Sequence, residues 1–250
     1  MPRPSQWLKY LSPSDSQAGP MLQVVCFPHS GGAAGVYRPL AAELAGDARV
    51  VAVQYPGRQD RHEEPVITSL HELADRITEE LRAAPADLPR VLLGHSMGAM
   101  LAYEVAQRLG SDGLLALIAS GRPAPSRVRL TTSYLLDDEA LAQQVVWLGG
   151  TAAELLDHPD MRALLLPLIR GDYQASETYR PRGDRPLSCP LVALGGDADP
   201  VALIGDLAAW SEHTTGPFRL ELLAGGHFYL QDHWPAVADL VRSTMLVPES

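Results

Sequence analysis

One pentapeptide of the sequence has the residue types and spacing that catalysis by a serine nucleophile requires. In Gly94-His95-Ser96-Met97-Gly98 a serine stands between two glycines, in the pattern G-x-S-x-G. A serine hydroxyl is a weak nucleophile unless a neighbouring base takes its proton, and the base needs a carboxylate to orient it. The pattern therefore predicts Ser96 as a nucleophile, with a histidine and an acid elsewhere in the chain.

The segments around Ser96 support this interpretation. The apolar run from Arg90 to Leu93 is typical of a buried strand, and the spacing from Ala99 to Leu109 is helical. A tight turn from strand to helix holds such a serine in a strained conformation above the sheet, and the flanking glycines leave room for the turn. Strand, turn and helix together predict a nucleophile elbow, which is typical of the α/β-hydrolase fold.

Two aspartates are candidates for the acid. Asp197 and Asp199 lie in the turn that follows the apolar run from Pro190 to Leu194. In parallel α/β sheets the functional residues gather at the carboxyl ends of the strands. In hydrolases of this type the acid usually stands three residues beyond the turn glycine. That spacing favours Asp199 and leaves Asp197 as the alternative.

His227 is the best candidate for the base. It follows the predicted strand Arg219 to Leu223 in the glycine-rich loop Gly225-Gly226, and the order Ser, Asp, His along the chain is the expected one. The other histidines adjoin turns or lie in segments with a helical or polar pattern. For those we expect packing, hydrogen-bonding or solvated roles.

Backbone N–H groups are the expected stabilisers of the reaction intermediate. The former carbonyl oxygen becomes negatively charged, and each N–H donor aimed at it contributes about 3 kcal/mol. The N–H of Met97, directly after the nucleophile, is one predicted donor. The second is predicted in the turn after the first long strand, at Ser30 with Gly31 as the runner-up, although the glycines there could also serve the turn alone.

The remaining pattern predicts the architecture that positions these groups. Strands alternate with helices along most of the chain, which implies a mostly parallel sheet with helices on both faces and a single domain over residues 1–250. Further strands are predicted at Leu22–Phe27, Arg49–Val53 and Leu114–Ser120, and further helices at Pro39–Ala45, Ser69–Ala83 and Trp234–Met245.

The alternation stops between Pro123 and Pro190, where the sequence is rich in helical patterns. We interpret residues 128–180 as a helical lid over the site and expect it to be mobile. Helices are predicted at Asp137–Leu148, Ala152–Leu156 and Asp160–Asp172. The lid has more leucines than one small helix needs, so Leu164 and Leu168 are expected either to line an acyl pocket or to pack the lid onto the domain.

Composition excludes several other classes of protein. Hydrophobic residues make up 46% and charged residues 20% of the 250 residues, and the net charge is −10 without a basic cluster, so nucleic acid is not an expected partner. No run reaches the roughly 18 apolar residues that span a membrane. Nothing near the amino terminus resembles a secretion signal, so a cytoplasmic protein is expected. We also expect the protein to be a monomer. Cofactors and metals are not implied by any motif.

The motifs together resemble those of a known family. The chain is similar to the stand-alone type II thioesterases of polyketide and nonribosomal peptide assembly lines, over residues 24–241. The motifs that carry the resemblance are the turn at residues 27–32, Tyr55-Pro56-Gly57-Arg58, the elbow around Ser96, the turn at residues 196–200 and the loop around His227. Ser30 departs from the pattern, since relatives often have alanine there.

The resemblance implies an activity and a partner. Such enzymes hydrolyse acyl groups from the phosphopantetheine arm of acyl or peptidyl carrier proteins and remove aberrant or stalled units. Arg58 or Arg61 would then contact a phosphate of the arm, or be solvated or ion-paired. Two alternatives stay open, an esterase or lipase acting on oxygen esters, and a hydrolase scaffold that binds a carrier without catalysis.

Overall fold

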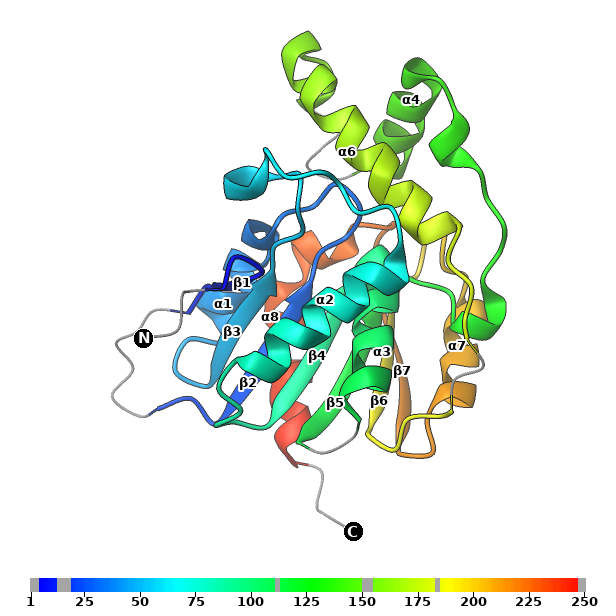
Figure 1. The fold of residues 1–250 in the computed structure, drawn as a ribbon. Coiled ribbons are helices and arrows are strands. Elements are labelled where there is room, and N and C mark those ends of the chain that lie inside the picture. Colours follow the sequence, from blue (N-terminus) through cyan, green and yellow to red (C-terminus); the bar gives the residue numbers. More distant parts are fainter. Residues whose placement is uncertain (1–4, 13–18, 111–112, 150–154, 183–184, 247–250) are drawn as a thin grey trace.

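A central sheet covered by helices on both faces organises the computed structural model of the protein (Figure 1). The structure describes residues 5–12, 19–110, 113–149, 155–182 and 185–246. The sheet has seven strands in the order β1-β3-β2-β4-β5-β6-β7, and β1 with β3 is the antiparallel pair. The other neighbours are parallel. This arrangement confirms the fold class predicted from the sequence.

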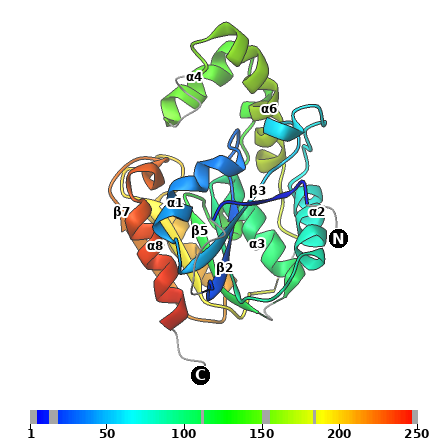
Figure 2. The ribbon, with the colours of Figure 1, turned by 90° about the vertical axis from the view of Figure 1, so that its left-hand side faces the viewer.

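The strands and helices largely match the predicted ones. The strands are β1 (Leu8–Tyr10), β2 (Leu22–Phe27), β3 (Ala48–Val53), β4 (Arg90–His95), β5 (Leu114–Ser120), β6 (Leu191–Gly196) and β7 (Phe218–Leu223). Helices α1 (Arg38–Glu43) and α8 (Trp234–Ser243) cover one face, and α2 (Leu70–Ala83) and α3 (Met97–Leu109) cover the other (Figure 2). The sequence did not predict β1 or α7 (Ile204–Ala208), because elements of three and five residues are too short to show a period.

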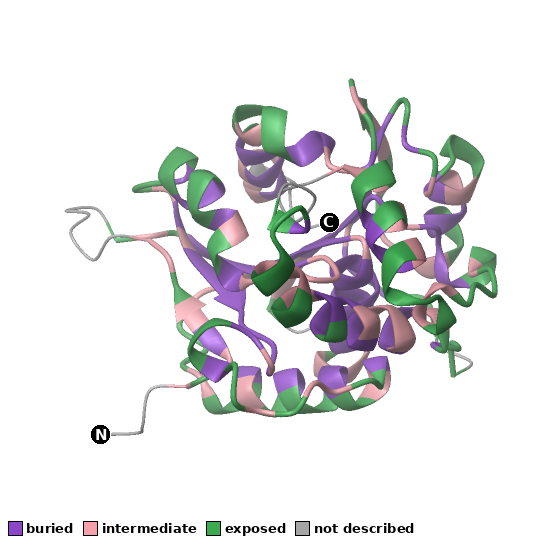
Figure 3. Ribbon diagram, turned by 90° about the horizontal axis from the view of Figure 1, so that it is seen from above, coloured by how far each residue is buried: buried purple, intermediate pink, exposed green. Residues whose placement is uncertain are grey.

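Alternation along the strands divides the core into two layers. In β2, Val25 and Phe27 belong to the layer beneath α2 and α3, whereas Val24 and Cys26 belong to the layer beneath α1 and α8. All four side chains are fully buried, as expected for a central parallel strand. Seen from above, buried residues follow the strands and the inner faces of the helices (Figure 3). The sheet is therefore a rigid platform for the loops at its edge.

The cysteines belong to this interior. Cys26 and Cys189 are buried free thiols. Burial raises the pKa of Cys189 to about 11, and it raises the pKa of Cys26 further. Both therefore stay protonated and act as small apolar side chains.

The segment between β5 and β6, where the sequence predicts a lid, contains two long helices. Helices α4 (Asp138–Leu148) and α6 (Pro159–Glu177) stand above the carboxyl ends of the strands (Figures 1 and 2). Asp137 caps α4 by accepting a hydrogen bond from the N–H of Ala140. The predicted helix over Ala152–Leu156 lies mostly outside the described residues. None of the described helices is long and apolar enough to cross a membrane.

Candidate active site

Ser96 occupies the turn between β4 and α3 in a backbone conformation that is rare for a residue with a side chain. Its φ and ψ are 55° and −119°. The turn is so tight that a Cβ on Gly94 would lie 2.0 Å from the carbonyl oxygen of Gly98, and one on Gly98 would lie 2.0 Å from that of Phe27. The glycines of the G-x-S-x-G pattern are therefore required by close backbone contact, which wedges the elbow against the end of β2.

Gly98→Ala is expected to destabilise the protein strongly. The added methyl group meets backbone atoms of Phe27 and Pro28, so α3 and the end of β2 must move apart, at a cost of about 3 kcal/mol or more. For a protein of this size that lowers the midpoint of thermal unfolding by roughly 6–12 °C. Gly205→Ala in α7 is the matched control, because nothing lies within 4 Å of the added methyl group there. Equal midpoints for the two variants would contradict the wedge.

The structure brings the predicted nucleophile, base and acid together in one hydrogen-bonded chain. His227 Nε2 lies 3.0 Å from Ser96 Oγ, and His227 Nδ1 lies 2.9 Å from Asp199 Oδ2. A carboxylate only accepts, so Nδ1 carries the proton and Nε2 is free to accept from the serine hydroxyl. The side chains of His227 and Asp199 are 3% and 0% exposed. The geometry is that of a serine activated by an oriented imidazole.

The two aspartates of the acid turn have different surroundings. Asp199 is buried, and its Oδ1 accepts from the N–H of Val201 at 2.8 Å while Oδ2 faces His227. Asp197 is exposed, and its Oδ1 accepts from the N–H of Gly225 at 2.9 Å. Asp197 therefore fastens the turn after β6 to the loop that carries His227. Its carboxylate has a structural partner of its own.

Two further histidines lie beside the base. His95 Nδ1 is 2.9 Å from the hydroxyl of Ser120, which in turn lies 2.6 Å from the hydroxyl of Tyr229. Burial, with the nearby charge of His227, holds the pKa of His95 well below its usual range, and burial is also the main reason that the pKa of His29 falls to about 4. Both rings are neutral at neutral pH, so they add no positive charge beside the base.

The backbone donors predicted for the intermediate lie at this site. Met97 is the first residue of α3, where N–H groups have no partner within the helix. Ser30 and Gly31 form the turn after β2, which is closed by a hydrogen bond from the N–H of Gly32 to the carbonyl of His29 at 2.9 Å. The N–H of Gly31, the runner-up, is already donated to Asp172 at 2.8 Å.

A cavity of about 290 Å³ opens onto Ser96 and His227. Ser30 and the insertion residues Trp147 and Tyr173 are among its walls, together with Arg122, whose Nε has no hydrogen-bond partner among the described residues. A larger cavity of about 1020 Å³ lies beyond His29 and His95, and its described walls include none of the three triad residues.

The structure does not bring the two predicted pocket leucines to the cavity at Ser96. Leu164 is 61% exposed. Leu168 is 5% exposed and packs with Leu141 and Val145 in a small core between α4 and α6. The excess of leucines in this insertion is therefore explained by packing of its helices against each other, which was the alternative interpretation.

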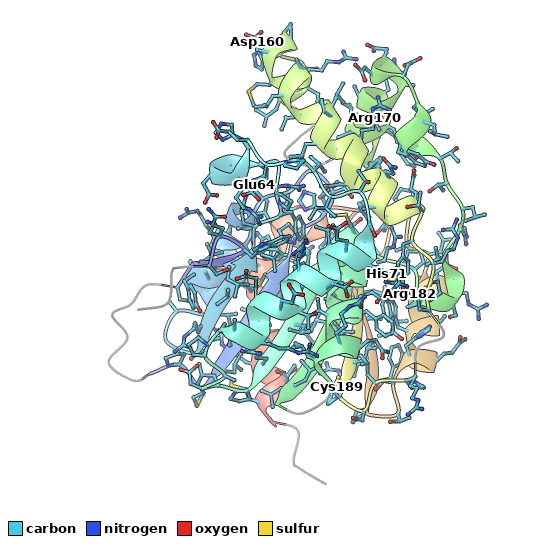
Figure 4. The ribbon with its side chains drawn as sticks, viewed as in Figure 1. Glu64, His71, Asp160, Arg170, Arg182 and Cys189 are labelled. Atoms are coloured by element: carbon cyan, nitrogen blue, oxygen red, sulfur yellow. The ribbon has the colours of Figure 1, made fainter. Side chains whose placement is uncertain are left out.

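Arg58 is ion-paired, which was one of the two expectations for this residue. Its guanidinium is buried and forms a bidentate ion pair with Asp172 of α6, at 2.7 and 2.8 Å. Asp172 was not singled out in the sequence, because an aspartate near the end of a helical pattern usually faces solvent. Arg61 is also buried, and it pairs with Glu64. Figure 4 shows Glu64 at the outer edge of the segment that follows β3.

The sheet and the elbow are those of an α/β-hydrolase, and Ser96, His227 and Asp199 form its candidate catalytic site. The thioesterase domain family matches residues 22–245. The chain belongs to this family. It is 45% identical over 236 residues to a probable cadicidin biosynthesis thioesterase of Streptomyces griseus, covering 93% of this chain and 64% of that protein. It is 38% identical over 247 residues to the thioesterase PikA5 of Streptomyces venezuelae, covering 96% and 86%.

Comparison with a solved structure also identifies the chain as similar to a thioesterase. The type II thioesterase BorB of the borrelidin biosynthetic cluster superposes with a TM-score of 0.86 at 43% identity, covering 96% of this chain and 97% of that one. The agreement extends over nearly the whole of both chains. Fold and family are thus established together.

Proposed function

We propose that this protein is a serine thioesterase that hydrolyses acyl groups from the phosphopantetheine arm of acyl or peptidyl carrier proteins, as an editing enzyme of polyketide or nonribosomal peptide biosynthesis. The observation that carries the proposal is the hydrogen-bonded chain from Ser96 through His227 to the buried Asp199, beside a cavity. Its relatives from such pathways support the choice of a thioester substrate.

The geometry supports a two-stage reaction. Ser96 Oγ attacks the thioester carbonyl while its proton passes to His227 Nε2, and the N–H groups of Met97 and Ser30 stabilise the oxyanion. The carbon–sulfur bond then breaks, and the arm leaves as a thiol with the proton from His227. A water molecule, deprotonated by His227, attacks the acyl-serine ester. The bond between the acyl carbon and Ser96 Oγ then breaks, Ser96 Oγ takes the proton back from His227, and the carboxylic acid is released. Asp199 holds the imidazole in the required tautomer throughout.

Paired substrates test the thioester assignment. We expect the N-acetylcysteamine thioester of a short acyl chain to be hydrolysed with a higher kcat/KM than the oxygen ester of the same acyl group. A clear preference for the oxygen ester would assign the protein to the esterases instead. Labelling of Ser96 by a fluorophosphonate probe tests the third alternative, because a scaffold that only binds carriers would stay unlabelled.

The proposed partner is tested directly with carrier proteins. Acyl-loaded carriers are incubated with the protein, and loss of the acyl group is followed by mass. Release from the carrier at a higher kcat/KM than from the small thioester supports carrier recognition, while equal values would remove it. We further propose that the protein acts as a monomer in the cytoplasm; the two free buried thiols fit a reducing compartment.

A further inference from the structure

The carboxylate of Asp172 joins the long insertion helix α6 to the turn that carries Ser30. Its Oδ2 accepts from the backbone N–H of Gly31 at 2.8 Å. The two terminal nitrogens of Arg58 hold the same carboxylate at 2.7 and 2.8 Å. Arg58 Nη1 also donates to the carbonyl oxygen of Gly32 at 3.0 Å. We call this set of contacts the Arg58–Asp172 clamp.

Tight packing surrounds the clamp on both sides of α6. A Cβ on Gly31 would lie 2.9 Å from Cγ1 of Ile169, and a Cβ on Gly171 would lie 2.6 Å from Cγ1 of Val66. This part of α6 is therefore enclosed between the turn after β2 and the segment that follows β3. The side chains of Arg58 and Asp172 are 5% and 1% exposed, so solvent screens the clamp very little.

The turn itself needs such a clamp. Gly31 has a φ of +77°, as in a type II turn with glycine at the third position. Glycine adopts either sign of φ at little cost, so the peptide unit between Ser30 and Gly31 can flip by half a turn. Such a flip would reverse the Ser30 carbonyl and the Gly31 N–H and change ψ of Ser30, so the turn would no longer hold the preceding peptide unit, which carries the Ser30 N–H, in the same place. The bond from the Gly31 N–H to Asp172 holds one of the two orientations.

We infer that Asp172 is a positioning residue for the oxyanion hole, acting from the insertion helix through Gly31 on the N–H of Ser30. The inference rests on the proposed function, because it takes Ser96 as the nucleophile. Asp172 touches neither Ser96 nor His227, and its effect is on the geometry of a donor. The two hydrogen bonds from the Arg58 guanidinium in turn fix this buried carboxylate in place.

The clamp also divides α6 into two parts. Pro167 lies between the clamp and the outer half of the helix and has no N–H to donate, which weakens the helix there. Figure 4 shows Asp160 at the outer tip of α6, farthest from the sheet. The outer half can therefore bend away while Ile169 and Asp172 stay in place.

Two double variants separate the acceptor from the ion pair. Removing one charge alone would bury the other unpaired and unfold the protein, so both are neutralised together. Arg58→Met with Asp172→Asn keeps a side-chain oxygen for the Gly31 N–H, whereas Arg58→Met with Asp172→Leu has the same shape and no acceptor. Relative to the asparagine double variant, we expect the leucine double variant to lose about 10²-fold in kcat with KM unchanged, the loss typical for one oxyanion donor.

A second readout reports on the oxyanion hole alone. A trifluoromethyl ketone adds to Ser96 and places an oxyanion in the hole, so its inhibition constant should rise in the leucine double variant by the factor that kcat falls. The ester used is whichever the wild type cleaves faster, thioester or oxygen ester, so failure of the thioesterase proposal does not affect the comparison. Arg170→Met is the control, since it loosens α6 from α4 and not from the turn. Equal kcat and inhibition constants for the two double variants, both folded, would overturn the inference, as would an equal loss of kcat in Arg170→Met.

Discussion

Ser96→Ala is expected to lose on the order of 10⁶-fold in kcat, the largest effect of any single substitution in this chain. The hydroxyl is the only group of Ser96 that the proposed reaction uses, and without it neither acyl transfer nor the ester intermediate can form. The measurement is hydrolysis of an acyl-N-acetylcysteamine thioester, followed by release of the free thiol. Slow residual turnover by water, aided by the backbone donors, would remain.

The same variant should fold normally. Among the described residues the Ser96 side chain hydrogen-bonds to His227, and the elbow is shaped by Gly94 and Gly98. The midpoint of thermal unfolding is therefore expected to stay within a few degrees of the wild-type value. Turnover at the wild-type rate in a folded Ser96→Ala protein would show that the nucleophile lies elsewhere.

The sequence was sufficient for the parts of the site that local backbone chemistry determines. The elbow follows from glycines at two fixed positions around Ser96, and the loops of Asp199 and His227 each follow a strand with a clear apolar pattern. Strands that are buried on both faces read as continuous apolar runs, which is why β2, β5 and β6 were predicted to within a few residues.

The parts that the sequence could not predict depend on contacts between distant segments. Arg58 and Asp172 are 114 positions apart, and only the folded chain shows that they meet. The surroundings of Leu164 and Leu168 could not be predicted for the same reason. Whether Leu168 faces a cavity or another helix depends on where α4 lies, and no periodicity within α6 contains that information.

Asp199→Asn and Asp197→Asn should give very different results, although the two residues are two positions apart. At Asp199 the amide can donate toward His227 Nδ1, which favours the tautomer with the proton on Nε2. That tautomer cannot accept from Ser96, and a loss of about 10⁴-fold in kcat is expected. At Asp197 the amide oxygen still accepts from Gly225, so kcat should fall less than about fivefold, in line with one exchanged exposed hydrogen bond.

The pair is informative because each variant controls for the other. Both remove one negative charge from the same turn, so a general electrostatic effect of that charge would lower kcat in both. In the proposed reaction the two aspartates differ in their contact with the base, because Asp199 lies 2.9 Å from His227 Nδ1. Thermal unfolding checks that both variants are folded before kcat is compared. If Asp197→Asn were the severe variant, the acid would have to be reassigned to Asp197, and His227 would need to turn toward it during the reaction.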